Sequence, residues 1–223
     1  MQPTVVFVTG GTGYMGRALI ASLLTRRHTV HALARPGSER KLPGGVVAVT
    51  GDALDGKSFA SAIPPGATVV HLVGTPHPGP TKAAEFERVD LVSIRAATFA
   101  AHDARAAHFV YVSVAHPAPV MHAYIGVREQ GEALVGATGI PATILRPWYV
   151  LGPGHYWPCL LIPFYALGRL FPATREQATR LGLVTLRQMV TALTVAVETP
   201  PSASVRIVDV PGIQQAQLRT VEP

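Results

Sequence analysis

Val5-Val6-Phe7-Val8-Thr9-Gly10-Gly11-Thr12-Gly13-Tyr14-Met15-Gly16 is the stretch that decides the fold of this chain. Its apolar, mostly β-branched start predicts a buried strand of a parallel sheet. Residues 17–24, directly after it, have the periodicity of a helix. Strand, glycine turn and helix in this order are typical of a Rossmann-type dinucleotide site, in which the helix N-terminus faces a pyrophosphate.

The glycines of this motif have separate expected tasks. Gly10 allows a sharp turn, Gly13 lets backbone amides approach a phosphate, and Gly16 lets the helix pack closely on the strand. The alternative is a glycine-rich turn without a ligand. The candidate cofactor contacts in the loop are Gly10, Thr12, Gly13, Tyr14, Met15 and Gly16.

Composition narrows the class of protein. A length of 223 residues predicts one domain, and a hydrophobic share of 48% with 14% charged residues argues against disorder. The net charge of +6 comes from scattered arginines, which favours an anionic cofactor and no nucleic-acid partner. The histidines lack metal-ligand spacing, so no metal site is expected. The single Cys159 and the early first strand, which leaves no room for a signal peptide, predict a cytoplasmic protein.

Strand and helix patterns alternate along the chain, which predicts an α/β fold with a doubly wound parallel sheet. Strands are expected over 29–34, 46–50, 68–73, 108–113, 142–145 and 205–210, and helices over 57–63, 81–101, 121–135 and 185–198, with a polar tail after the last strand. Residues 1–153 are expected to form the NAD(P)-binding Rossmann domain. Residues 154–223 are expected to form a small C-terminal lobe, a substrate or lid portion that completes the same domain.

The end of the second strand indicates which nucleotide is preferred. An acidic residue there would select NAD, whereas an arginine accommodates the 2′-phosphate of NADP. Arg35 stands at this place, with Ser38 and Arg40 close behind, so NADP is expected and NAD is the alternative cofactor. A solvated basic loop would give the same sequence. Asp52 is either an adenine contact or a turn aspartate, and Gly74 is expected to mark close approach to a ligand.

The glycine motif, Gly51-Asp52, Tyr124-x-x-x-Arg128 and Leu145-Arg146-Pro147 resemble the short-chain dehydrogenase/reductase superfamily, in its extended-like and atypical branches. The chain is similar to small NAD(P)H-binding proteins, to the accessory subunit of respiratory complex I and to nitrogen-metabolite-repressor-type redox sensors. The resemblance implies nicotinamide near residues 147–150. The further expected cofactor contacts are Asp52, Ala53, Val73, Gly74, Ser113, Pro147 and Val150.

Active members of that family use Tyr-x-x-x-Lys and a hydroxyl after the fifth strand. Here Tyr124 matches the tyrosine, and Arg128 stands where the lysine is expected. Arginine keeps the charge but not the geometry of lysine. The hydroxyl position falls on Ala115, so Ser113 is interpreted as a strand-end residue at the cofactor. A helix-surface pair that packs against the sheet is the alternative for Tyr124 and Arg128.

Two functions follow from these motifs. The first is an oxidoreductase or epimerase that acts on a small apolar carbonyl compound, with Tyr124 as acid/base and Arg128 as its electrostatic partner. The second is a non-catalytic NADP(H)-binding redox sensor or assembly module. The apolar stretch 157–171 is expected to be a pocket lid. The alternatives are a homodimer surface and a contact with a membrane, and a membrane contact would suit quinone chemistry.

Overall fold

The computed structural model describes residues 3–152, 179–202 and 204–218. The predicted lid over 157–171 and Cys159 therefore lie outside the described residues. Among the helices that are described, none is both long and apolar enough to cross a membrane.

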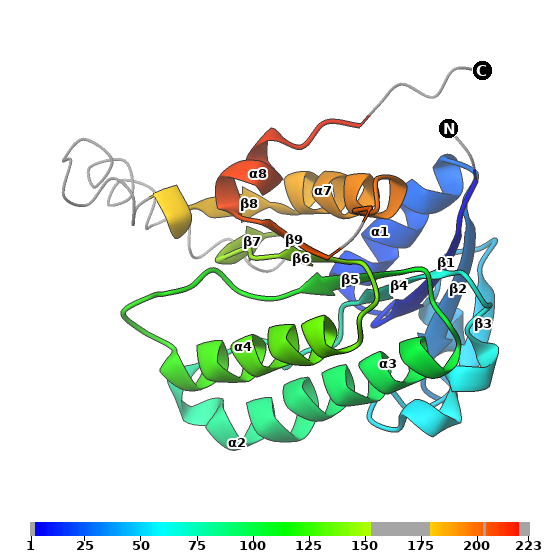
Figure 1. The fold of residues 1–223 in the computed structure, drawn as a ribbon, viewed down its shortest axis with the longest axis horizontal. Helices are drawn as coiled ribbons and strands as arrows, with labels where there is room; N and C mark the ends of the chain where they lie inside the picture. The colour runs from blue at the N-terminus through cyan, green and yellow to red at the C-terminus, as the bar shows by residue number, and fades with distance from the viewer. Residues whose placement is uncertain (1–2, 153–178, 203, 219–223) are drawn as a thin grey trace.

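A seven-stranded parallel sheet forms the centre of the molecule (Figure 1). Its strand order is β3-β2-β1-β4-β5-β6-β9, and every neighbouring pair is parallel. The strands are β1 (Val5–Thr9), β2 (Thr29–Ala34), β3 (Val47–Thr50), β4 (Thr68–His71), β5 (His108–Val112), β6 (Ala142–Leu145) and β9 (Val205–Val208). This sheet, with helices on both faces, confirms the predicted Rossmann-type class.

Two layers of helices cover the sheet (Figure 1). On one face lie α1 (Tyr14–Thr25) and α7 (Leu186–Glu198), which contact each other, and on the other lie α3 (Val92–Asp103) and α4 (His122–Ala137). Alternate strand residues supply the two cores. Val6, Val8 and Val110 pack toward α1 and α7, while Phe7, Val69 and Phe109 pack toward α3.

The segment between β4 and α3 is less regular than one predicted helix. It consists of a 3₁₀ turn η4 (Pro80–Lys82), one α-helical turn α2 (Ala83–Glu85) and a π-helical segment η5 (Phe86–Leu91) that continues into α3. The helix predicted over 57–63 is likewise two 3₁₀ turns, η2 (Gly56–Ser58) and η3 (Ala60–Ala62). A third short 3₁₀ turn, η1 (Glu39–Lys41), follows β2.

The C-terminal part differs from the prediction at two places. The strand predicted over 205–210 ends at Val208, because Asp209 accepts a hydrogen bond from the Gly212 amide and caps helix α8 (Val210–Gln215) within the expected polar tail. A second sheet of β7 (Tyr149–Leu151) and β8 (Leu183–Thr185) was not predicted.

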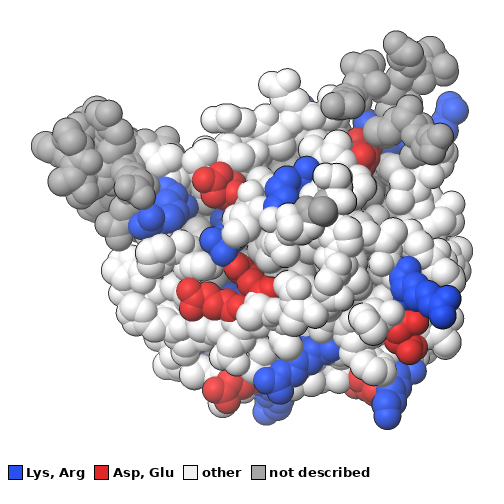
Figure 2. All heavy atoms as spheres, viewed as in Figure 1, with Lys and Arg blue, Asp and Glu red and all other residues white. Residues whose placement is uncertain are grey.

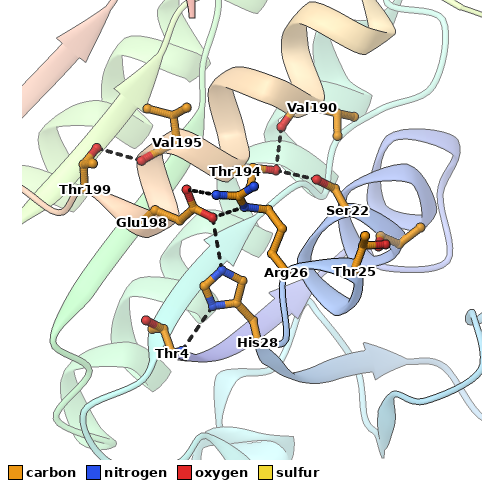
Figure 3. A network of polar contacts seen from close by, with 11 residues as sticks. Thr4, Ser22, Thr25, Arg26, His28, Val190, Thr194, Val195, Glu198 and Thr199 are labelled. Atoms are coloured by element: carbon orange, nitrogen blue, oxygen red, sulfur yellow. Dashed lines mark hydrogen bonds and ion pairs between the residues drawn. The ribbon is translucent and has the colours of Figure 1, made fainter. Parts of the chain in front are cut away.

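A buried polar network joins α1 to α7 at the amino edge of the sheet (Figure 3). Arg26 at the end of α1 makes a bidentate ion pair with Glu198 at the end of α7. His28 accepts the Thr4 amide hydrogen at Nδ1, 3.1 Å away, so its Nε2, 3.3 Å from Glu198 Oε1, carries the hydrogen toward the carboxylate. These contacts lie before β1 and β2, at the opposite edge from the glycine loop.

The surface carries charges of both signs. On the face in Figure 2, Lys and Arg side chains lie in separate places, with Asp and Glu side chains near several of them. The expectation that the protein has no nucleic-acid partner stays a prediction.

Candidate cofactor-binding and active site

The glycine loop forms a tight connection between β1 and α1. Gly10 has a φ of +75°, and a Cβ atom there would lie 2.8 Å from the Leu72 carbonyl carbon. A Cβ on Gly16 would lie 2.3 Å from the Gly10 carbonyl oxygen. Both positions therefore require glycine because backbone atoms pack too closely for a Cβ atom. Gly10 also requires it because of its positive φ.

The N-terminus of α1 fits an anionic group. Gly13 is the N-cap residue, is exposed and provides no side-chain cap hydrogen bond. The first amides of this 12-residue helix have no intrahelical acceptor, and the helix dipole favours negative charge at this end. A pyrophosphate would satisfy these donors, so the loop residues present fit the expected dinucleotide.

The residues expected near the adenosine lie at the ends of β2 and β3. Arg35 directly follows β2 and is exposed. Glu39 is turned toward β3, where it accepts the Thr50 hydroxyl hydrogen at 3.1 Å. Asp52 accepts the Leu54 amide hydrogen at 2.9 Å, which is the turn role considered for it. An adenine contact by Asp52 or the half-buried Ala53 stays a prediction.

Tyr124 lies in the first turn of α4 and is half-buried. Its ring packs against Phe86, with 4.9 Å between ring centroids. Burial, and then the nearby Tyr124, raise the pKa of Tyr14, the first residue of α1 after the glycine loop. The tyrosine of the expected catalytic motif is therefore close to the loop that is expected to hold the cofactor.

Arg128 is buried between α4 and the sheet, so burial alone does not decide between the catalytic role and the packing role considered for it. Its guanidinium donates to Asp90 Oδ1 at 2.5 Å and to the Val112 carbonyl at 3.0 Å. The guanidinium carbon lies 5.0 Å from the centroid of the Tyr124 ring. Burial disfavours the charged form, but Tyr124, Tyr111 and Asp90 outweigh it and raise the pKa of Arg128, so it stays charged.

Asp90 is a buried residue beside Arg128 that the sequence analysis missed. Its Oδ2 accepts hydrogen bonds from the Thr75 amide at 2.9 Å and from the Thr75 hydroxyl at 2.6 Å. A Cβ on the neighbouring Gly74 would lie 2.4 Å from Arg128 Nη2. The close approach observed at Gly74 is thus made by Arg128, a side chain of this chain. The available signal was an acidic residue directly between Val89 and Leu91, in a segment with helical apolar spacing.

Ser113 and Ala115 follow β5. Neither provides a hydroxyl group that is free to act on a substrate. The Ser113 hydroxyl donates to Glu132 Oε1 at 2.6 Å, and Arg146 donates to the same oxygen at 2.9 Å. Burial alone would raise the pKa of Glu132, but hydrogen bonds from Arg146 and Ser113 lower it. Ala115 is buried and has no hydroxyl at the position where the family pattern expects one.

His71, the last residue of β4, makes polar contacts both with Thr9, which directly precedes the glycine loop, and with Ser93 of α3. Thr9 Oγ1 lies 2.8 Å from His71 Nδ1, and Ser93 Oγ lies 3.3 Å from His71 Nε2. Burial, and then the charge of Arg128, lower the pKa of His71 to about 3, so the ring is neutral at pH 7.

The residues expected near the nicotinamide lie after β6. Pro147 is buried and accepts the Ala115 amide hydrogen at 2.9 Å, and Val150 is half-buried in β7. A Cβ on Gly152 would lie 3.3 Å from the Tyr14 ring. The glycine loop and the end of β7 are thereby brought together, while the half-buried Val73 follows β4. The part of the chain that is described holds no cluster of three or more metal-ligating side chains.

Comparison with known proteins agrees with this geometry. Residues 10–153 match the model of a family described as NAD(P)H-binding. The chain belongs to this NAD(P)H-binding family. This result confirms the resemblance found in the sequence.

Two curated relatives are reductases by name. The ceramide reductase of Caulobacter vibrioides is 29% identical over 216 residues, which cover 92% of this chain and 65% of that protein. A 4-hydroxy-2-methyl-3-oxo-4-farnesyl-3,4-dihydroquinoline-1-oxide ketoreductase of Stigmatella aurantiaca is 26% identical over 168 residues, covering 66% of this chain and 50% of that protein. The chain thus spans less than two thirds of the length of either relative.

A solved structure supports the fold. A short-chain dehydrogenase/reductase superfamily protein from Agrobacterium tumefaciens, with bound NAD, aligns with a TM-score of 0.65 at 22% identity, covering 91% of this chain and 76% of that chain. At this identity the likeness supports the architecture alone.

Proposed function

We propose that this protein is an NAD(P)H-dependent reductase of an apolar carbonyl compound, with Tyr124 as the proton donor. The observation that carries this proposal is the position of Tyr124. It lies beside the charged Arg128 and close enough to Tyr14 of the glycine loop to affect the pKa of Tyr14. A proton donor at a nicotinamide site needs this proximity.

The reaction divides between cofactor and protein. When bound, the reduced nicotinamide supplies a hydride to the carbonyl carbon. The Tyr124 hydroxyl then gives its proton to the carbonyl oxygen, so that an alcohol forms, and water returns a proton to the phenolate. The charge of Arg128 favours the phenolate during this step. The amides at the N-terminus of α1 would hold the pyrophosphate.

An apolar substrate is supported by two independent observations. The relatives are named for ceramide and for a farnesyl-bearing quinoline compound, both with long hydrocarbon groups. The stretch 157–171 of this chain is apolar, although it lies outside the described residues. We propose NADP as the preferred cofactor because Arg35 is exposed directly after β2.

The test is NADPH oxidation with aliphatic ketones and aldehydes of increasing chain length. Wild type is expected to oxidise NADPH faster with longer chains. Tyr124→Phe should lower kcat about 10²- to 10⁴-fold while NADPH still binds. Full turnover by Tyr124→Phe would refute the assigned proton donor.

A non-catalytic NAD(P)H-binding module is the second candidate. It is favoured by the Asp90 carboxylate, which compensates the charge of Arg128, and by the absence of a hydroxyl on Ala115. In that case the protein binds NADPH, as a redox sensor does, but no carbonyl compound accelerates the oxidation of NADPH.

A further inference from the structure

We propose that Asp90 is a positioning residue of this site, which fixes the Arg128 guanidinium against the Tyr124 ring and joins both to the loop after β4. The proposal rests on the proposed function, because it assigns how the proton donor is held. Asp90 itself touches neither substrate nor cofactor in this assignment.

Both carboxylate oxygens of Asp90 are used. Oδ1 accepts from Arg128, and Oδ2 accepts from the amide and the hydroxyl of Thr75. The Asp90 side chain has 0% exposure. It comes from η5, and single π-helical segments are frequently found at functional sites. One carboxylate therefore connects η5, the loop after β4 and α4.

These contacts fix the plane of the guanidinium. Arg128 Nη2 is held by Asp90, and Nη1 is held by the Val112 carbonyl and, at 3.4 Å, by the Tyr111 hydroxyl. A guanidinium donates in its own plane, so pinning both terminal nitrogens sets its orientation relative to the Tyr124 ring. A lysine has no such plane.

The site makes room for this arrangement. A Cβ on Gly74 would lie 2.4 Å from Arg128 Nη2, and a Cβ on Gly131 would lie 2.5 Å from the Tyr111 hydroxyl. Any side chain at either position would displace a member of the group. Arg128 Nε is buried without a hydrogen-bond partner among the described residues, so Nη1 and Nη2 carry all of its described hydrogen bonds.

A second buried ion pair of this chain provides the control for a purely structural role of Asp90. Arg26 and Glu198 form a second buried arginine–carboxylate pair, with side-chain exposures of 9% and 4%, at the opposite edge of the sheet (Figure 3). Its loss should destabilise the fold without reaching Tyr124. Asp90→Ala and Glu198→Ala thus separate positioning from stability.

The experiment combines ¹⁹F NMR with kinetics. In protein labelled with 3-fluorotyrosine, the Tyr124 signal is the one that disappears in Tyr124→Phe. We expect Asp90→Ala to move this signal and to lower kcat about 100-fold with NADPH affinity retained. Glu198→Ala should lower the melting temperature but leave the Tyr124 signal and kcat unchanged.

A second variant keeps the test decisive if Asp90→Ala is unstable. Asp90→Asn keeps Arg128 and the shape of the Asp90 side chain but removes its charge, so it should be more stable than Asp90→Ala while the Tyr124 signal is still displaced. An unmoved Tyr124 signal in both Asp90 variants, or equal kcat losses in Asp90→Ala and Glu198→Ala, would overturn the proposal. If the signal moves but wild type reduces no carbonyl compound, the positioning stands and the reductase function fails.

Discussion

Replacing Gly16 with alanine tests the packing of α1 on β1 most sharply. The new Cβ would lie 2.3 Å from the Gly10 carbonyl oxygen and 2.8 Å from Gly11 Cα. Both are backbone atoms, so the helix must move away from the loop. Overpacking of this kind costs about 3 kcal/mol, and each kcal/mol lowers the melting temperature of a domain of this size by about 2–4 °C. We therefore expect a decrease of about 6–12 °C and weaker NAD(P)H binding.

Gly136→Ala is the control with the opposite expected sign. Gly136 lies near the end of α4, and a Cβ there has no atom within 4 Å. Alanine is the better helix former by up to about 1 kcal/mol, so this variant should melt at or above the wild-type temperature. Differential scanning calorimetry of both variants gives the comparison. Equal melting temperatures of Gly16→Ala and wild type would refute the packing argument.

Three further predictions concern stability, cofactor choice and pH. Glu198→Ala should lower the free energy of unfolding in urea by about 3–5 kcal/mol, because it leaves Arg26 buried without its carboxylate. Arg35→Ala should weaken NADPH binding and leave NADH binding unchanged in titration calorimetry. The pKa values of His71 and His108, lowered mainly by burial to about 3 and about 4, lie below the ordinary 6.5. The unfolded chain therefore binds protons first, and stability should fall as the pH falls from 6.5 to about 3, less steeply in His71→Asn.

The parallel sheet could be predicted because its signals are local. Runs of β-branched residues separated by helical periodicity and turn residues marked its strands. The three-residue strands β7 and β8 gave no such signal, because their pairing is determined by contacts between distant segments. The start of α8 was visible in principle, since Asp209 is an N-cap residue followed by Pro211.

The site was predictable to a different extent at each residue. The glycine loop has its own sequence motif, and Tyr124 was found by its spacing to Arg128. Arg128 pairs with Asp90, which lies 38 positions earlier in the sequence. No local pattern therefore reveals this ion pair or the burial of Arg128. The same holds for Gly74, whose neighbour is a side chain from α4.

Calorimetric titration of NADPH into wild type and Gly13→Asp tests the central claim most directly. Gly13 is the N-cap of α1 with a φ of −74°, and a Cβ there has one neighbour within 4 Å, the Gly10 carbonyl oxygen at 3.3 Å. This oxygen must shift by a few tenths of an ångström, and the cap hydrogen bond of the aspartate side chain offsets that cost. Its carboxylate would occupy the place of the pyrophosphate. We predict that wild type binds NADPH, whereas Gly13→Asp keeps its thermal stability but binds neither NADPH nor NADH. Equal affinity in both proteins, or no binding to wild type, would contradict the account.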